Sequence, residues 1–332
     1  MKKKKTVNYR LLIQIIFFVL IAFISINKTL VQTGMGISFL AATSLHAICP
    51  FGGVETLYTF FSSGLLLEKV AMSSLILMAL VFLLALLFGP VFCGWVCPLG
   101  SFQEWIGKLG KKIFKKKYNK FIPDKVHNIL RFFRYFLLVW VLYITARSGS
   151  LLFLNIDPYH ALFKFYTGTV AIQALLVLIT IIVLSLFVER PWCKYACPFG
   201  AVLGLFNKIR IFKLKRNNDT CISCQKCSRV CPMKINICQN DTVTNVNCIS
   251  CMACTSSMNC PKTDTLDLQI TGKKRTLKIK PALLSIIIVF VIFGGILISS
   301  LLGLWQSSNK TEADGNRKNQ QETYSSEDQF NQ

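Results

Sequence analysis

The chain has 332 residues, 53% of them hydrophobic, and carries a formal net charge of +23. Water-soluble domains rarely combine this hydrophobicity with so large a charge, whereas membrane proteins with basic loops often do. The composition therefore excludes an ordinary soluble domain and indicates an integral membrane protein.

Five apolar runs predict membrane-spanning helices, because several approach the ~20 residues that a helix needs to cross ~30 Å of hydrocarbon. The first run follows a basic start, but no small-residue cleavage site comes after it, so it is interpreted as a retained anchor and not as a signal peptide. The runs cover residues 11–26, 70–88, 132–146, 170–188 and 282–304.

The basic residues predict the orientation of these spans. Lysines and arginines gather before the first span, between the second and third, after the fourth and before the fifth, whereas loops 28–69 and 147–169 carry few charges. Cytoplasmic flanks are enriched in basic residues, so the N-terminus is predicted inside and the C-terminus outside. The basic runs also predict contact with anionic membrane lipid. No nucleic-acid binding is expected, because no reader motif accompanies them.

The outer loops contain polar groups with two open interpretations. Glu55, Asp157 and His160 lie near the predicted outer face, where a quinol-using protein needs a proton acceptor. The alternative is that they are ordinary interfacial polar residues. Haem ligation by His46 or His160 is not expected, because no C-x-x-C-H motif is present. Cys49, in the same outer region, is interpreted as structural or incidental.

A C-x3-C-P pattern follows both the second and the fourth apolar run, one hundred residues apart. Each copy therefore consists of a span, an outer loop, a second span and an inner C-x3-C-P turn, which predicts a duplicated two-span unit. Because each unit has an even number of spans, the copies would share one orientation and be related by an axis along the membrane normal. The cysteines are Cys93 and Cys97 in the first copy and Cys193 and Cys197 in the second.

These turns raise the hypothesis of a shared metal centre. Cysteines at positions i and i+4 lie on one face of a helical turn. Two thiolates make a poor metal site, whereas four make a good one, so Cys93, Cys97, Cys193 and Cys197 are candidates for a third centre, most simply iron–sulfur. The alternatives are that each pair forms a redox-active dithiol or serves as a docking turn.

Residues 221–261 carry the most specific motif in the chain. The first half matches the C-x2-C-x2-C-x3-C-P spacing of a bacterial [4Fe-4S] site, and a related C-x2-C-x2-C run follows. In two-cluster ferredoxins the Cys-Pro thiolate ligates the other cluster. This assigns Cys221, Cys224, Cys227 and Cys260 to one cluster, and Cys248, Cys251, Cys254 and Cys231 to the other.

Two features qualify that assignment. Five residues separate Cys254 from Cys260 where the pattern has three, so Cys260 departs from the standard spacing. Cys238 lies between the two halves and is interpreted as structural or incidental. The alternatives for the whole stretch are a disulfide framework, which needs an oxidising compartment, and a zinc site, which usually has two C-x2-C pairs.

On residues 93–100, 193–200 and 221–261, the chain resembles the polytopic membrane 4Fe-4S ferredoxins of the NapH type and the iron–sulfur half of NosR-type proteins. The resemblance covers residues 11–261 and implies electron transfer between a quinol pool, or a cytoplasmic donor, and a reductase system outside. It implies a subunit in electron transfer with cytoplasmic and extracytoplasmic redox partners, and possible use of a quinone. An assembly factor that reduces a metal and a redox sensor are the alternatives.

The predicted fold is therefore an α-helical integral membrane protein of the cell membrane, with a small α+β two-cluster, bacterial-ferredoxin-like domain in the cytoplasm. The polar composition of the last residues predicts disorder. The predicted domains are a four-span membrane domain at 1–210, the ferredoxin-like domain at 211–272, a basic flank with a fifth span at 273–306, and a polar tail at 307–332.

Overall fold

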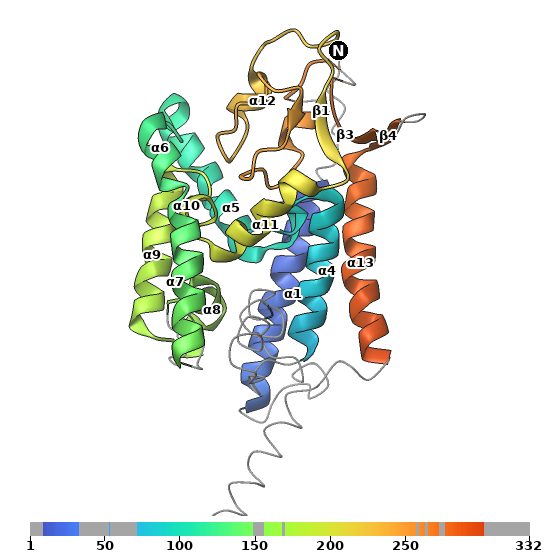
Figure 1. Cartoon of the computed structure of the whole chain (residues 1–332). Helices are drawn as coiled ribbons and strands as arrows, with labels where there is room; N and C mark the ends of the chain where they lie inside the picture. The colour runs from blue at the N-terminus through green and yellow to red at the C-terminus, as the bar shows by residue number, and fades with distance from the viewer. Residues whose placement is uncertain are drawn as a thin grey trace, which may run out of the picture.

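The protein has a largely helical body with a small antiparallel sheet at one end (Figure 1). His46, Cys49, Glu55 and the predicted tail lie outside the residues that the structure describes. The computed structural model describes residues 9–32, 53, 72–148, 156–167, 170–256, 259–262, 265–271 and 276–301.

Apolar helices form along all five predicted runs. Within the described residues, the stretches 9–31, 124–145 and 281–301 are long and apolar enough to cross a membrane, and a bent pair at 158–167 and 172–187 raises the number to four. The predicted third run extends back to residue 124. The apolar helices are α1 (Tyr9–Gln32), α4 (Met72–Phe88), α7 (Phe133–Ser148), α9 (Ile172–Phe187) and α13 (Pro281–Leu301).

The outward faces of these helices are apolar. Val19 and Phe23 on α1, Leu176 on α9 and Leu297 on α13 are all exposed, and Phe290 on α13 is 75% exposed. Contiguous apolar surface of this extent is rare on soluble monomers and is normal on a helix that faces lipid. The protein is therefore a membrane protein.

Two segments of the chain pack reciprocally. One is α4, the turn η2 (Phe92–Val96) and α5 (Pro98–Phe114); the other is α9, α10 (Pro191–Tyr195) and α11 (Pro198–Ile209). Helix α5 of the first segment contacts α9 of the second, and α11 contacts α4. Helix α1 contacts η2 and α5, just as α7 contacts α10 and α11. The last helix of each segment therefore packs on the apolar helix of the other segment.

Short elements connect these segments. The turn η3 (Lys115–Lys117) and helix α6 (Asp124–Leu130) lead from α5 to α7, and α8 (Pro158–Lys164) with η5 (Phe165–Thr167) leads from α7 to α9. Helix α8 packs on α9. The side chain of Asp157 accepts a hydrogen bond from the Tyr159 backbone N–H at 3.0 Å and caps α8. Asp157 therefore has a structural role at this helix start.

A four-stranded antiparallel sheet lies beside the ends of α1, α4 and α13 (Figure 1). Its order is β2-β1-β3-β4, and the cysteine-rich loops with α12 (Lys226–Arg229) and η6 (Ala253–Thr255) surround it. Strand β3 pairs antiparallel with β4 up to Thr271 and Thr276, and α13 begins two residues after β4. The strands are β1 (Lys213–Arg216), β2 (Thr242–Val243), β3 (Leu266–Thr271) and β4 (Thr276–Ile279).

One apolar core joins the sheet to the helices. Pairing aligns Leu214 with Val243 and Leu268, and Leu268 with Ile279, so four buried side chains form a row across all four strands. This row belongs to the same buried cluster as residues on α1, α4, η2 and α13, among them Trp95. The sheet is therefore packed onto the helical part as one body.

Gly94→Ala tests the contact between these parts. A Cβ at position 94 would lie 2.5 Å from the Ile249 carbonyl oxygen and 3.2 Å from the Cα of Cys251. Because both neighbours are backbone atoms, we expect overpacking that lowers the free energy of unfolding by about 1–3 kcal/mol. Thermal unfolding in detergent, followed by circular dichroism, measures the change.

Gly294→Ala is the matched control, because a Cβ at position 294 in α13 has nothing within 4 Å. This substitution should leave stability unchanged or raise it by up to about 1 kcal/mol, the helix-propensity difference between glycine and alanine. Equal unfolding midpoints for the two variants would contradict the close contact at Gly94.

Candidate metal centres

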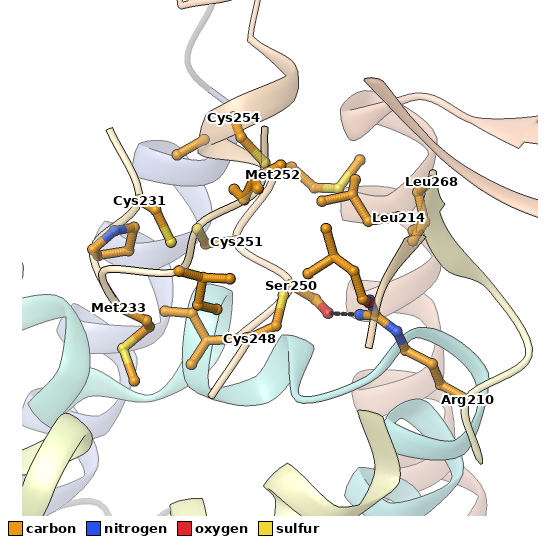
Figure 2. Close-up of a pocket in the computed structure, with 16 residues that line it drawn as sticks. Arg210, Leu214, Cys231, Met233, Cys248, Ser250, Cys251, Met252, Cys254 and Leu268 are labelled. Atoms are coloured by element: carbon orange, nitrogen blue, oxygen red, sulfur yellow. Dashed lines mark hydrogen bonds between the residues drawn. The ribbon is translucent and has the colours of Figure 1, made fainter. Parts of the chain in front are cut away.

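Four cysteines from two distant loops surround one pocket beside the sheet. This proximal set consists of Cys231, Cys248, Cys251 and Cys254, the four that the sequence analysis grouped together. Figure 2 shows their sulfur atoms around a common space. Cys251 and Cys254 are buried. Apolar side chains complete the lining, including Leu214, Met233, Ile235, Val243 and Leu268.

The proximal thiols are held in an environment that suits metal ligation. Burial first, and the neighbouring Cys251 second, raise the pKa of Cys231 to about 12, although the backbone N–H groups of Ile235 and Met233 donate to its sulfur. A thiol with this pKa does not ionise at neutral pH by itself, whereas a coordinated thiol is deprotonated outright. Cys231 would therefore ionise at neutral pH only if a metal bound it.

A second group of thiols lines a separate and more exposed pocket. The distal set consists of Cys221, Cys224, Cys227 and Cys260, again the four that the sequence analysis grouped together. Hydrogen bonds, first from the Ser223 backbone and then from Arg216, lower the pKa of Cys221. The Arg216 Nη1 lies 3.4 Å from this sulfur.

Cys238 also lines the distal pocket. From the sequence, Cys238 is expected to be structural or incidental, because it lies between the two ferredoxin halves. No local signal identifies it, since the fold of the loop alone brings it beside the other four thiols.

The two cysteine loops have the same unusual backbone. In each C-x2-C-x2-C run, the residues on either side of the middle cysteine have positive φ: Ser223 and Gln225 in one, Ser250 and Met252 in the other. For residues other than glycine this conformation is strained and persists only where surrounding structure enforces it. The repetition indicates that both loops are shaped for the same kind of ligand.

The cysteines of the two C-x3-C-P turns converge. This repeat set consists of Cys93, Cys97, Cys193 and Cys197. Burial and then Cys193, Cys93 and Cys97 raise the pKa of Cys197. Gln103 Nε2, on the helix that follows the first turn, lies 3.6 Å from the Cys193 sulfur, so the two turns lie side by side. Both turns close with an i→i+5 bond of 2.9 Å, from Cys97 N to Phe92 O and from Cys197 N to Trp192 O. The second cysteine of each turn is the N-cap of the next helix, followed by proline at N1.

The donor chemistry of all three sets fits an iron–sulfur cluster. Within the described parts of the chain, no three Cys, His, Asp or Glu side chains are arranged to hold a single metal ion. The thiols of the proximal and distal sets instead line two pockets. This arrangement suits a cubane, because each of its four irons takes one thiolate.

Buried positive charge supports this fit. Arg134, Arg190 and Arg210 are each at most 2% exposed, at the junction between the helices and the cysteine loops. The Nε atoms of the three arginines are buried and have no hydrogen-bond partner among the described residues. Buried cations are costly, and thiolate-ligated clusters would supply negative charge and sulfur acceptors beside them.

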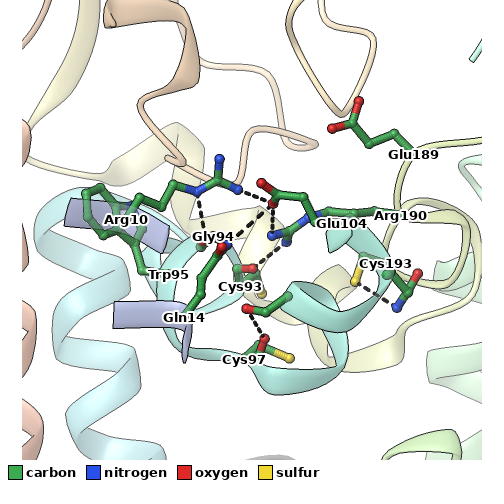
Figure 3. Close-up of polar contacts among 12 residues, drawn as sticks. Arg10, Gln14, Cys93, Gly94, Trp95, Cys97, Glu104, Glu189, Arg190 and Cys193 are labelled. Carbon is green, nitrogen blue, oxygen red and sulfur yellow. Dashed lines mark hydrogen bonds and ion pairs between the residues drawn. The ribbon is translucent and has the colours of Figure 1, made fainter. Parts of the chain in front are cut away.

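A buried charge network surrounds the first turn (Figure 3). Arg190 donates to the Cys93 carbonyl oxygen and to Glu104 Oε2, both at 2.6 Å. Arg10 donates to the Gly94 carbonyl at 3.1 Å and also pairs with Glu104. Burial by itself would raise the pKa of Glu104, but Arg10 and Arg190 outweigh it and lower this pKa to about 2. The carboxylate therefore stays ionised and ties α1, α5 and the two turns together.

The proximal loop is bonded directly to the helical part. Trp95 Nε1 donates to the Ser250 carbonyl at 3.1 Å, and Asn207 Nδ2 donates to the Cys248 carbonyl at 2.7 Å. Arg210 Nη1 donates to Ser250 Oγ at 2.8 Å (Figure 2). With the close approach of Gly94, these bonds fix the proximal set against the first C-x3-C-P turn.

Comparison with known proteins gives matches over most of the chain. A family described as a 4Fe-4S binding domain matches residues 70–117 and again residues 170–217, so each match contains one C-x3-C-P turn. An uncharacterised protein of Methanocaldococcus jannaschii, MJ0750, is 36% identical over 253 residues, which are 76% of this chain and 99% of that protein. No solved structure gives a significant match.

Two further relatives have names that refer to redox proteins. YccM of Escherichia coli, whose name provisionally assigns it to electron transport, is 29% identical over 289 residues, 83% of this chain and 79% of that protein. The ferredoxin-type protein NapH of Haemophilus influenzae is 27% identical over 216 residues, 59% of this chain and 72% of that protein. The chain carries two [4Fe-4S] clusters and serves iron–sulfur electron transfer.

Glu104→Gln tests the buried network. The substitution keeps the shape but leaves Arg10 and Arg190 without their anion, and losing one partner of a buried ion pair typically costs about 3–5 kcal/mol. We expect a markedly lower unfolding midpoint in detergent at neutral pH.

Asp124→Asn is the control, because the Asp124–Lys234 pair is 3.5 Å long and its carboxylate is exposed. Exposed pairs contribute little, so this midpoint should hardly move. If Glu104→Gln had the same unfolding midpoint as Asp124→Asn, the buried network would not stabilise the fold.

Proposed function

The chain belongs to the family of polytopic membrane 4Fe-4S ferredoxins that includes NapH-type and NosR-type proteins, and from this premise we propose that it relays single electrons between a quinol pool, or a cytoplasmic donor, and a reductase system across the membrane. The observation that carries the proposal is the arrangement of three thiol sets in series, from an exposed loop to the ends of the membrane helices. The protein would act as a subunit of a larger redox system and have partners on both sides.

The proposed ligands of the two established clusters are the proximal and distal sets. Cys231, Cys248, Cys251 and Cys254 would hold one, and Cys221, Cys224, Cys227 and Cys260 the other. Bound clusters supply one-electron oxidation and reduction, with potentials set by burial, charge and hydrogen bonds to sulfur. The chain contributes a dry, apolar lining at the proximal pocket and an exposed rim with Arg216 at the distal one.

The repeat set is the proposed site of a third iron–sulfur centre. The reciprocal packing of the two segments supports a duplicated unit with an approximate twofold relation, because the α5–α9 contact has a counterpart in α11–α4 and the α1–α5 contact has one in α7–α11. Such a relation places one cysteine pair from each copy at the shared axis. Ligand sites of this kind lie at repeat interfaces in other membrane proteins.

The series order follows from exposure and contact. Ile222 beside Cys221 is exposed, so the distal set faces solvent and suits a soluble partner. The proximal set lies between the distal set and the repeat set. Its Cys251 is in close contact with the C-x3-C-P turn that begins at Cys93. Gly94 leaves room for this approach, and its replacement by a larger residue would separate the two sets.

The proposed topology places the thiol sets and the start of α1 in the cytoplasm, and the C-terminus outside. Arg10 near the start of α1 reaches Gly94 and Glu104, so this end of α1 lies beside the cysteine turns. Helix α13 begins next to the sheet and runs away from it (Figure 1). In the proposed division, a four-span membrane domain covers 1–210, the ferredoxin-like domain 211–272, the basic flank and fifth span 273–306, and the polar tail 307–332.

Iron analysis tests the number of centres. Protein purified without oxygen should contain about twelve irons per chain, because three cubanes each contain four. Replacing Cys93 and Cys193 by serine should remove about four of them, whereas replacing Cys251 and Cys254 should remove a different four. A wild-type value near eight, unchanged in Cys93→Ser/Cys193→Ser, would reject the third centre and leave the two-cluster relay in place.

Reduction by quinol tests the relay itself. Adding a short-chain quinol to anaerobic membranes should reduce the clusters of the wild-type protein, as measured by electron paramagnetic resonance. The Cys93→Ser/Cys193→Ser variant should react much more slowly with quinol but normally with dithionite, which reaches the exposed distal set. Failure of quinol to reduce the wild-type protein would exclude the quinol pool as donor.

A further inference from the structure

The distal pocket contains five thiols, one more than a cubane requires. Cys238 lines it together with Cys221, Cys224, Cys227 and Cys260. Four irons take four thiolates, so one thiol of the five is in excess.

The loop that carries Cys238 is built to hold it in place. Ser228 Oγ accepts hydrogen bonds from the backbone N–H of Ile237 at 2.9 Å and of Cys238 at 3.1 Å. Asn236 Nδ2 donates to Gln239 Oε1, and Asn240 Nδ2 donates to the Asn236 carbonyl, both at 2.6 Å. Because Ser228 directly follows Cys227, these bonds tie Cys238 to the loop of the other distal cysteines.

The side chain of Cys238 faces this set. Cys238 lines the same pocket as Cys221, Cys227 and Arg216. Cys260, by contrast, directs its thiol to the carbonyl of Lys262 in its own loop at 3.3 Å. Cys260 is also the cysteine whose spacing departs from the ferredoxin pattern. Two thiols therefore compete for one corner of the site.

We propose that Cys238 is an alternative fourth ligand of the distal site and exchanges with Cys260 on one iron. The inference rests on the proposed assignment of Cys221, Cys224 and Cys227 as the other three ligands. In the exchange, the iron–sulfur bond to Cys260 breaks and Cys260 takes up a proton. Cys238 gives up its proton and forms the new bond, and no oxidation state changes.

With Cys238 as an alternative ligand, the distal site could keep a bound cluster after Cys260 is lost as a ligand. The distal set lies where oxidants and electrophiles reach it, and thiol modification follows exposure. Modification of Cys260 would leave Cys238 in position to complete the site. The proximal pocket is lined by four cysteines only, and two of them are buried.

Serine variants test the exchange by iron and sulfide content. Cys238→Ser and Cys260→Ser should each retain the iron of the wild-type protein, with a changed electron paramagnetic resonance signal in the reduced Cys260→Ser variant. Cys238→Ser/Cys260→Ser should lose about four irons per chain. Loss of this iron in either single variant, or its retention in the double variant, would overturn the proposal.

Cys224→Ser separates this inference from the proposed function, because it removes a ligand that has no substitute. Loss of about four irons supports the distal assignment, whereas full retention rejects both the assignment and the exchange. Mass spectrometry of the alkylated wild-type protein provides a second measurement that needs no variant. Partial labelling of both Cys238 and Cys260 is expected, and complete labelling of one with full protection of the other would overturn the exchange.

Discussion

The close contact between the first C-x3-C-P turn and the loop of residues 246–251 is the interaction on which the remaining architecture depends. Gly94 permits it, since any side chain there would collide with the backbone of Ile249 and Cys251. Trp95 and Asn207 then bond to the backbone of the same loop. These contacts join the sheet to the helices in one core, and they place two thiol sets side by side without a flexible linker.

Buried charged side chains surround the contact between the helices and the cysteine loops. Arginines and a lysine are buried around the thiol sets, and only Glu104 and Glu189 are buried acids among the described residues. An excess of buried cations is unfavourable by itself and becomes favourable when anionic clusters occupy the neighbouring pockets.

The two C-x3-C-P turns differ in the residue that follows their first cysteine. Where the first turn has Gly94 and contacts the proximal loop, the second has Lys194, which is buried and bonded to Asn119 at 3.1 Å. In the first turn, the glycine at position 94 lets this turn lie close to the backbone of Ile249 and Cys251. The first turn therefore differs from the second at the position that lies against the proximal loop.

The sequence by itself determined the features that are local in the chain: the apolar helices, the C-x3-C-P turns and the partition of eight cysteines into two groups. Apolar runs and cysteine spacings are constraints within one helix or one loop, so they are visible without the fold. Only the tertiary structure decided that the two C-x3-C-P turns meet, that Cys238 joins the distal pocket, that β4 extends the sheet and that Arg10, Glu104 and Arg190 form one network. These features join residues far apart in the chain, and their proximity depends on how whole elements dock, which no local pattern records.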